Sequence, residues 1–176
     1  MLTRQLINIP VHLGLDHLPN IYCGVAVFVL LPLYIMCSKV NAREKIGKCV
    51  ILLIFLTAFN LNIPNYIWHG MHFPNSLPCR QSFIYIFFLL AMCYEAVINL
   101  KNSTNRQLGA SLWIAIGLLL IMEELFINSE TEYSFKSVYI SGIFILIYGL
   151  LMFIHNNAKF KIPVVLMLTF SVSLIE

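Results

Sequence analysis

Six apolar stretches, separated by short polar segments, account for most of this chain and leave few folds open to it. The first five are close to the roughly 20 residues of helix that cross the hydrocarbon core of a bilayer. In lipid, every backbone N–H and C=O group must find its partner within the chain, so spanning segments of this kind are helices. The sequence therefore predicts an all-α, polytopic transmembrane bundle of about six spans, at residues 21–38, 46–63, 82–100, 108–126, 138–154 and 162–175.

Composition places the whole chain in the membrane class. Hydrophobic residues make up 60% of the sequence and charged residues 11%, which is more apolar surface than a soluble domain can bury. The net charge of +3 is small and no basic patch interleaved with aromatic residues is present, so no nucleic-acid partner is expected. The five cysteines show no CxxC spacing, which argues against a zinc site or a disulfide framework.

Lysine and arginine gather in three of the connecting segments. Residues 39–48 hold four of them, residues 101–106 hold two and residues 155–161 hold two, together eight of the eleven in the chain. Basic loops of membrane proteins stay on the cytoplasmic side. The predicted topology therefore puts these three segments inside, and it puts the leading segment 1–20 and the loop 64–81 outside.

The last apolar stretch, residues 162–175, is shorter than the others. At 1.5 Å per residue its 14 residues would extend about 21 Å, short of the roughly 30 Å hydrocarbon core. We therefore expect this span to be truncated and the chain to be a segment of something longer.

One polar stretch, residues 60–83, interrupts the apolar pattern and reads NLNIPNYIWHGMHFPNSLPCRQSF. Its three prolines and four asparagines make it too polar and too broken for a membrane helix. It is therefore predicted to face outward as a loop at the rim of the bundle. The candidate binding residues all lie in it: Trp68, His69, His72, Asn75 and Arg80.

Three sequence motifs resemble those of the YfhO family of bacterial multi-spanning membrane proteins. They are WHGMHFPNSLPCRQSF at residues 68–83, LPNIYCG at 18–24 and REK at 43–45, and they cover most of the chain in order and spacing. Two positions depart from the family pattern, because Cys79 and Gln81 stand where aromatic residues flank the arginine in the family.

The resemblance implies an activity and a location. Members of the family are much longer and look like GT-C-type glycosyltransferases, which move a sugar from a polyprenyl-phosphate carrier onto a cell-envelope polymer such as teichoic acid. Their catalytic carboxylate sits in a first outer loop for which this chain has no equivalent, so the catalytic residue is unknown. The implied partners are membrane lipid, the lipid-linked sugar and the polymer acceptor, in the bacterial plasma membrane.

Arg80 is the leading candidate for binding a phosphate, since the planar guanidinium can grip two phosphate oxygens at once. The alternative is an interfacial arginine that binds ordinary lipid headgroups. His69 and His72 are three residues apart and could share a divalent metal ion, but two histidines make only half a site. A hydrogen-bonding or acid–base role is favoured for them, and no metal or other cofactor is expected.

Trp68 and Asn75 each have two possible roles. The indole could stack on a sugar ring, yet tryptophan is also typical of the aromatic belt at a membrane interface. Asn75 follows a proline and suits a turn as well as it suits a ligand contact.

Glu95 is the acid that lies well inside a predicted span. A buried acid in a membrane marks an ion path or a contact between helices. The first reading would make the protein a small transporter or flippase-like subunit; the second, which is favoured, would pair Glu95 with Lys101 or place it at the inner interface. A third possibility is an inactive fragment of a split gene.

Overall fold

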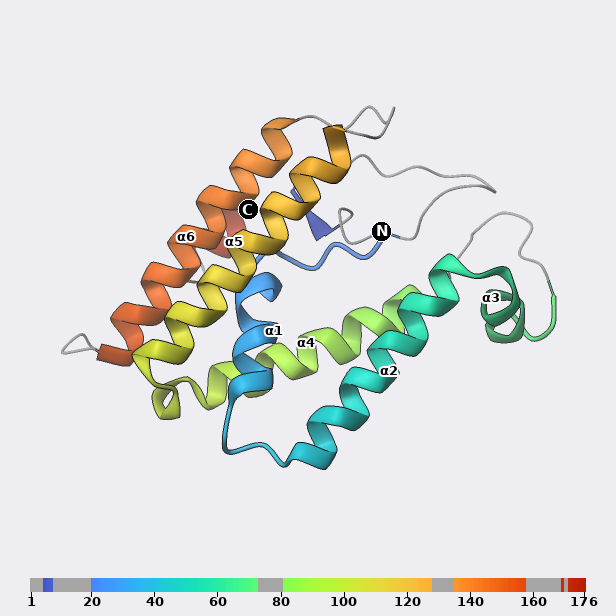
Figure 1. Ribbon diagram of the computed structural model, residues 1–176, viewed down its shortest axis with the longest axis horizontal. Helices are drawn as coiled ribbons and strands as arrows, with labels where there is room; N and C mark the ends of the chain where they lie inside the picture. Colours follow the sequence, from blue (N-terminus) through green and yellow to red (C-terminus); the bar gives the residue numbers. More distant parts are fainter. Residues whose placement is uncertain (1–4, 8–19, 73–80, 128–134, 158–168, 170) are drawn as a thin grey trace.

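The computed structural model describes residues 5–7, 20–72, 81–127, 135–157, 169 and 171–176. This part of the chain is helical and contains no strand, which confirms the all-α prediction (Figure 1). Its elements in chain order are α1 Val27–Met36, α2 Ala42–Asn60, α3 Asn62–Trp68, α4 Ser82–Ile98, the short 3-10 helix η2 Leu100–Asn102, α5 Asn105–Ile127 and α6 Phe135–Asn157.

Two of the described helices are long and apolar enough to cross a membrane, α5 over Asn105–Glu124 and α6 over Lys136–Asn157. The other elements do not meet that test. Helix α1 has 10 residues and would extend about 15 Å, α3 has 7 residues, and α4 has 17. Helix α2 has 19 residues, but four charged side chains occupy its first half. The structure therefore does not confirm six spans, and most of residues 162–175 lies outside the described part of the chain.

Helix α2 begins four residues before the predicted span because side chains in and before its first turns cap and stabilise the helix N-terminus. The side chain of Asn41 caps it by accepting a hydrogen bond from the Arg43 N–H at 3.1 Å. Glu44 then pairs with Lys48 one turn later, with 2.6 Å between Nζ and Oε1. The basic segment predicted as a loop is therefore mostly helix.

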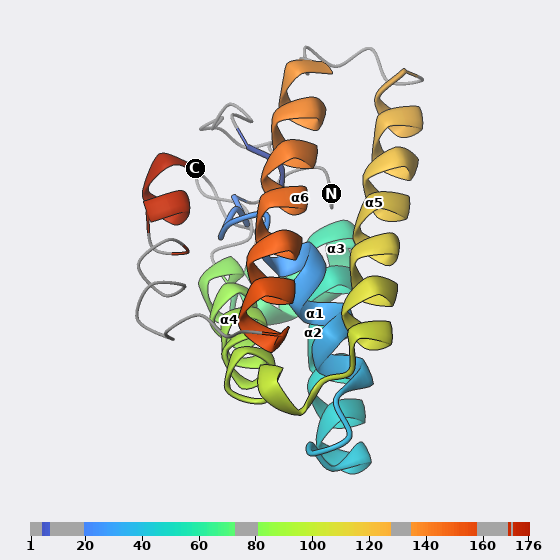
Figure 2. The same cartoon turned by 90° about the vertical axis from the view of Figure 1, so that its left-hand side faces the viewer.

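Helices α5 and α6 pack side by side in opposite directions along small side chains (Figure 2). Gly142 and Gly149 of α6 lie against α5, because a Cβ at these positions would be 4.0 Å from Leu119 Cδ1 and 2.7 Å from Leu112 Cδ1. Small residues let membrane helices approach closely. At the end of the pair, the Asn105 side-chain amide donates to the side chain of Asn157 at 2.9 Å.

Helix α1 is the core of the molecule. It contacts α4, α5 and α6, and its side chains are buried on almost every side. Helices α2 and α4 lie next to each other, and α4 runs across the α5–α6 pair instead of along it (Figure 1). Part of the predicted outer segment also belongs to this core: Leu6 and Ile7 are buried, and the Ile7 N–H donates to Ser141 Oγ at 3.1 Å.

The starts of α2 and α5 and the end of α6 lie toward the same end of the molecule (Figure 2). Hydrogen bonds connect these ends: Gln107 Nε2 donates to the Met36 carbonyl at 3.0 Å, and Asn156 Nδ2 donates to the Ser103 carbonyl at 3.0 Å. Lys45 Nζ donates to the Ile35 carbonyl at 2.8 Å and so covers the end of α1. The starts of α2 and α5 and the end of α6 are therefore neighbours.

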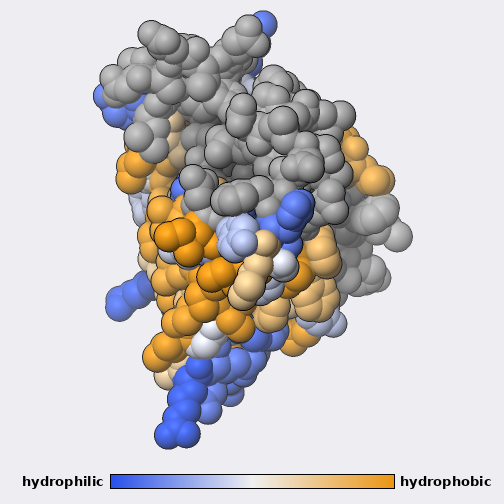
Figure 3. Space-filling view, turned by 90° about the vertical axis from the view of Figure 1, so that its right-hand side faces the viewer, coloured by the Kyte–Doolittle hydropathy of each residue, from blue (hydrophilic) through white to orange (hydrophobic). Residues whose placement is uncertain are grey.

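Large apolar side chains cover the outer faces of α2, α5 and α6. They include Ile46, Val50, Leu53, Trp113, Ile121, Leu146 and Leu150, all exposed. On the side of the molecule where α2 lies, apolar side chains form a band. Below this band, hydrophilic side chains gather where α2 begins (Figure 3). Apolar surface of this extent marks contact with lipid or with another protein.

Candidate functional site at the α3–α4 junction

The short helix α3 forms within the stretch that the sequence predicted to be a loop. Pro64 lies in its first turn, where a missing N–H costs nothing. Helix α3 packs on α2 through the rings of Trp68 and Phe55, whose centroids are 4.8 Å apart and whose planes are inclined by 30°. Gly70 and Met71 then adopt positive φ angles, 67° and 61°, which end the helix and turn the chain.

A polar cluster joins the end of α3 to the start of α4. The Gln81 side-chain amide donates to Asn65 Oδ1 at 3.2 Å, and His69 Nδ1 lies 2.8 Å from the Asn65 carbonyl oxygen. Because a carbonyl only accepts, His69 Nδ1 is the donor, and Nε2 of the neutral ring is then an acceptor. We call Asn65, His69 and Gln81 the junction cluster.

Two atoms of the junction cluster are buried and have no hydrogen-bond partner among the described residues. They are His69 Nε2 and Gln81 Oε1, and both are acceptors in the arrangement above. A buried polar atom without a partner costs free energy, so such atoms are typical of sites that a ligand completes. Two acceptors together suit a hydroxyl-rich ligand, and a neutral imidazole nitrogen can also take a proton from a hydroxyl.

The other predicted binding residues surround the junction cluster or fall outside the described part. Trp68 stacks on Phe55 with one face, and its side chain is 44% exposed. His72 is exposed at the end of the turn. Asn75 and Arg80 lie outside the described residues. In the described part of the chain no three His, Cys, Asp or Glu side chains come together, and the Asn65 carbonyl already occupies one nitrogen of His69.

Glu95 lies in the last turn of α4, far along the helix from the junction cluster. Its carboxylate forms an ion pair with Lys48 of α2, and Lys48 also pairs with Glu44. The Lys48 ammonium sits 5.5 Å from the centroid of the buried Tyr34 ring on α1. The partner of Glu95 is therefore Lys48 and not Lys101, and the pair connects α2 to α4.

A second carboxylate was not anticipated from the sequence. Glu176 accepts hydrogen bonds from the Tyr22 hydroxyl at 2.7 Å, the Tyr148 hydroxyl at 2.5 Å and the Val25 N–H at 2.6 Å. It therefore ties the start of α1 to the middle of α6. Partners this far apart in the sequence give no local signal.

Asn65 and Gln81 were also missed as members of a site. Asn65 lies in the segment predicted to be a loop, and Gln81 was interpreted as a departure from the family pattern. The spacing of Asn65 and His69, four residues apart, was the available signal, because such pairs share a face once the segment is helical.

Comparison with known protein families matches residues 5–176 to the family described as "Bacterial membrane protein YfhO". No curated protein and no solved structure matches the chain significantly. The matched range covers nearly all of the 176 residues, including the junction cluster and the Lys48–Glu95 pair. The chain therefore belongs to the YfhO family of bacterial membrane proteins.

Proposed function

We propose that this chain is part of a polytopic, glycosyltransferase-like protein of the bacterial plasma membrane. It would transfer a sugar from a polyprenyl-phosphate carrier to a cell-envelope polymer such as teichoic acid, with the α3–α4 junction contacting the donor. The observation that carries this proposal is the pair of buried acceptor atoms, His69 Nε2 and Gln81 Oε1, that have no partner among the described residues. Sugar hydroxyls are donors of the kind that these atoms lack.

The residues around the junction cluster supply the other contacts that a lipid-linked sugar needs. Arg80 directly precedes Gln81 and offers a charge for the phosphate. The half-exposed face of Trp68 offers a flat apolar surface for a sugar ring. Proton transfer at the acceptor hydroxyl would fall to His69 Nε2, and a divalent metal is not needed for any of these contacts.

Replacing Arg80 with alanine in the complete protein is expected to reduce both envelope glycosylation and binding of polyprenyl phosphate by about ten- to a hundredfold. A charge-assisted hydrogen bond to a phosphate is worth about 1.5–3 kcal/mol, which corresponds to that factor. The measurements are sugar incorporation into the envelope polymer and binding of radiolabelled polyprenyl phosphate.

Arg106→Ala is the matched control for this substitution. Arg106 is exposed in the first turn of α5, among the predicted cytoplasmic segments, so its loss should leave both quantities unchanged. If Arg80→Ala behaved like Arg106→Ala, the phosphate-binding role of Arg80 would be wrong.

The alternative function, a transporter or flippase-like subunit, requires Glu95 to exchange a proton. The ion pair with Lys48 gives Glu95 a role in holding α2 to α4. The structure therefore supports the transferase-like proposal more than this alternative. Proton-linked flux in vesicles that was abolished by Glu95→Gln would reverse that preference.

The proposal places α3 in the outer membrane interface, and the two tryptophans of the chain can test this. The exposed apolar side chains Leu61, Ile63, Ile67 and Met71 surround Trp68, as in a helix that lies in the headgroup region. In Trp113→Phe protein, we expect lipids brominated near the headgroup to quench Trp68 emission more than lipids brominated near the end of the acyl chain.

The reverse order is expected for Trp68→Phe protein, in which Trp113 remains. Trp113 lies eight residues into α5, about 12 Å from the start of the helix and near the bilayer centre. An α3 that projects into water would leave Trp68 unquenched by either lipid, and that result would remove the interfacial placement.

A further inference from the structure

Two contacts fix how α2 and α4 lie against each other. Near the end of α2 and the start of α4, the rings of Phe59 and Tyr85 meet edge to face, with centroids 5.6 Å apart. Toward the other end, the ion pair of Lys48 with Glu95 joins the first half of α2 to the last turn of α4. The two helices are therefore antiparallel, and residues before Lys48 on α2 reach the same end of the molecule as residues after Glu95 on α4.

Three exposed cations lie beyond the ion pair at that end. They are Lys39 in the turn before α2, Arg43 in the first turn of α2, and Lys101 in η2 directly after α4. Arg43 lies about 7.5 Å beyond Lys48 by helical rise, and Lys101 lies roughly 9 Å beyond Glu95. The cations of the two neighbouring elements are thus at a similar level, and we call the three residues the α2–α4 basic end.

The charge of the α2–α4 basic end is not offset by acids of the described part of the chain. The two carboxylates nearest to it in the sequence, Glu44 and Glu95, both pair with Lys48, and none of the three cations forms an ion pair with a described residue. Arg43 also lies at a helix N-terminus, where the helix dipole adds positive charge. Hydrophilic side chains gather on the surface where α2 begins (Figure 3). An anion that binds there would relieve the repulsion between these like charges.

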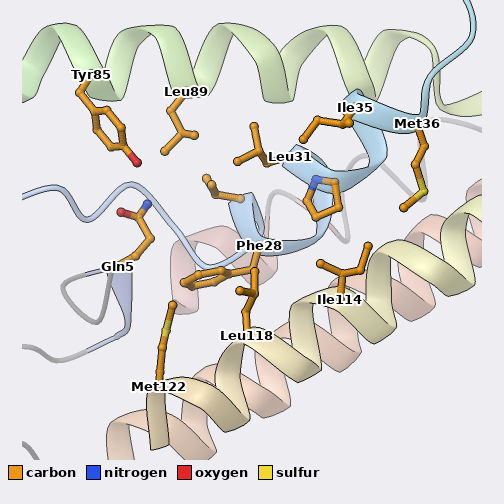
Figure 4. Close-up of a pocket in the computed structure, with 12 residues that line it drawn as sticks. Gln5, Phe28, Leu31, Ile35, Met36, Tyr85, Leu89, Ile114, Leu118 and Met122 are labelled. Atoms are coloured by element: carbon orange, nitrogen blue, oxygen red, sulfur yellow. The ribbon is translucent and has the colours of Figure 1, made fainter. Parts of the chain in front are cut away.

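Apolar side chains are exposed directly beside two of the cations. Ile46 is three residues after Arg43 and 64% exposed, and Ile98 is three residues before Lys101 and 60% exposed. Residues three apart lie on the same side of a helix. The face of α4 that carries Tyr85 points toward α1 (Figure 4), so the face with Ile98 is turned outward. A phospholipid has the same order of groups, with a charged phosphate next to its acyl chains.

We propose that the α2–α4 basic end binds the headgroup phosphate of an anionic phospholipid such as phosphatidylglycerol. The lipid bridges the start of α2 and the turn after α4, while its acyl chains lie on the exposed apolar side chains beside the cations. A zwitterionic headgroup is disfavoured, because its own ammonium group approaches three cations. Free phosphate is disfavoured because it makes no apolar contact. The inference does not depend on sugar transfer, since it requires only that the chain lies in a membrane.

The test is native mass spectrometry of the complete protein in detergent with phosphatidylglycerol or with phosphatidylcholine of the same acyl chains. Each Lys or Arg near a membrane surface strengthens the binding of an anionic lipid about fivefold. With three cations, we expect phosphatidylglycerol to bind at least about twentyfold more tightly than phosphatidylcholine. Arg43→Gln combined with Lys101→Gln should weaken phosphatidylglycerol binding by about twentyfold and leave phosphatidylcholine binding unchanged.

Two further variants separate the effect of charge from that of structure. Arg43→Lys combined with Lys101→Arg keeps both charges and should bind phosphatidylglycerol like the unmodified protein. Lys136→Gln is the matched control for Arg43→Gln alone. Lys136 is exposed at the start of α6, at the opposite end of the molecule from the start of α2 (Figure 2), so its loss should leave binding unchanged.

Four results would each overturn the proposal. The first is equal affinity for the two lipids, and the second is a loss of binding in Lys136→Gln as large as in Arg43→Gln. The third is a loss in the charge-keeping variant as large as in the double glutamine variant, which would show that packing and not charge is responsible. The fourth is displacement of bound phosphatidylglycerol by an excess of inorganic phosphate, which would indicate a site for a free anion.

Discussion

Replacing Lys48 with alanine is expected to lower the free energy of unfolding by about 2–3 kcal/mol. The substitution leaves Glu95 without its partner between α2 and α4, and it also removes the cation from the face of the Tyr34 ring. Breaking a fully buried ion pair costs about 3–5 kcal/mol. The cost should be lower here because the side chains of Lys48 and Glu95 are 18% and 30% exposed, so water reaches part of the uncompensated charge.

The measurement is the midpoint of thermal unfolding in detergent, compared with that of two further variants. Lys101→Ala removes the cation nearest to Glu95 in the sequence and should have little effect, since Lys101 is exposed. The double variant Lys48→Met with Glu95→Gln removes both charges and should recover more than half of the loss. A Lys101→Ala protein as unstable as Lys48→Ala would show that the pairing is wrong.

The pairing of Glu95 illustrates what the sequence could and could not provide. The intramembrane acid was visible, and so was its need for a partner. Lys101 was named as one possible partner because it is near in the sequence, but residues six apart lie about 240° apart around a helix and do not face each other. Lys48 is 47 residues away, and its approach to Glu95 depends on how α2 packs beside α4.

Helix positions were predictable to the extent that apolar runs determine them. All of α4 and most of α2, α5 and α6 lie within the predicted stretches. The first apolar run was misjudged, because Gly24 has a φ of 96° and the helix starts only after it, at Val27. The helical start of α2 was readable, since Asn41 followed by Glu44 three residues later is a helix-start pattern.

The junction cluster was predictable only in part. The segment was singled out by its polar, proline-containing sequence, and His69 and Trp68 were named within it. The contact of Gln81 with Asn65 joins residues 16 apart and depends on the turn at Gly70 and Met71. A single sequence does not specify the path of such a turn, because many loop paths connect the same two helices.

The second large effect on stability is expected from a substitution at the interface between α5 and α6. Gly149→Leu is expected to destabilise the protein by about 2–3 kcal/mol, because overpacking a well-packed contact costs up to about that amount. A Cβ at Gly149 would lie only 2.7 Å from Leu112 Cδ1 on α5. Alanine would be accommodated by a small movement of the flexible Leu112 side chain, whereas leucine would have to push the two helices apart.

Gly117→Leu separates this packing effect from the change in helix propensity. Gly117 is also inside a long apolar helix, α5, but a Cβ there would meet no atom within 4 Å. Both substitutions gain about 0.8–1 kcal/mol of intrinsic helix propensity, so Gly117→Leu should be neutral or slightly stabilising. The difference between the two melting temperatures then measures the close approach of α5 and α6 alone. If the two variants had the same melting temperature, the small-residue contact would not be what holds this pair of helices together in the membrane.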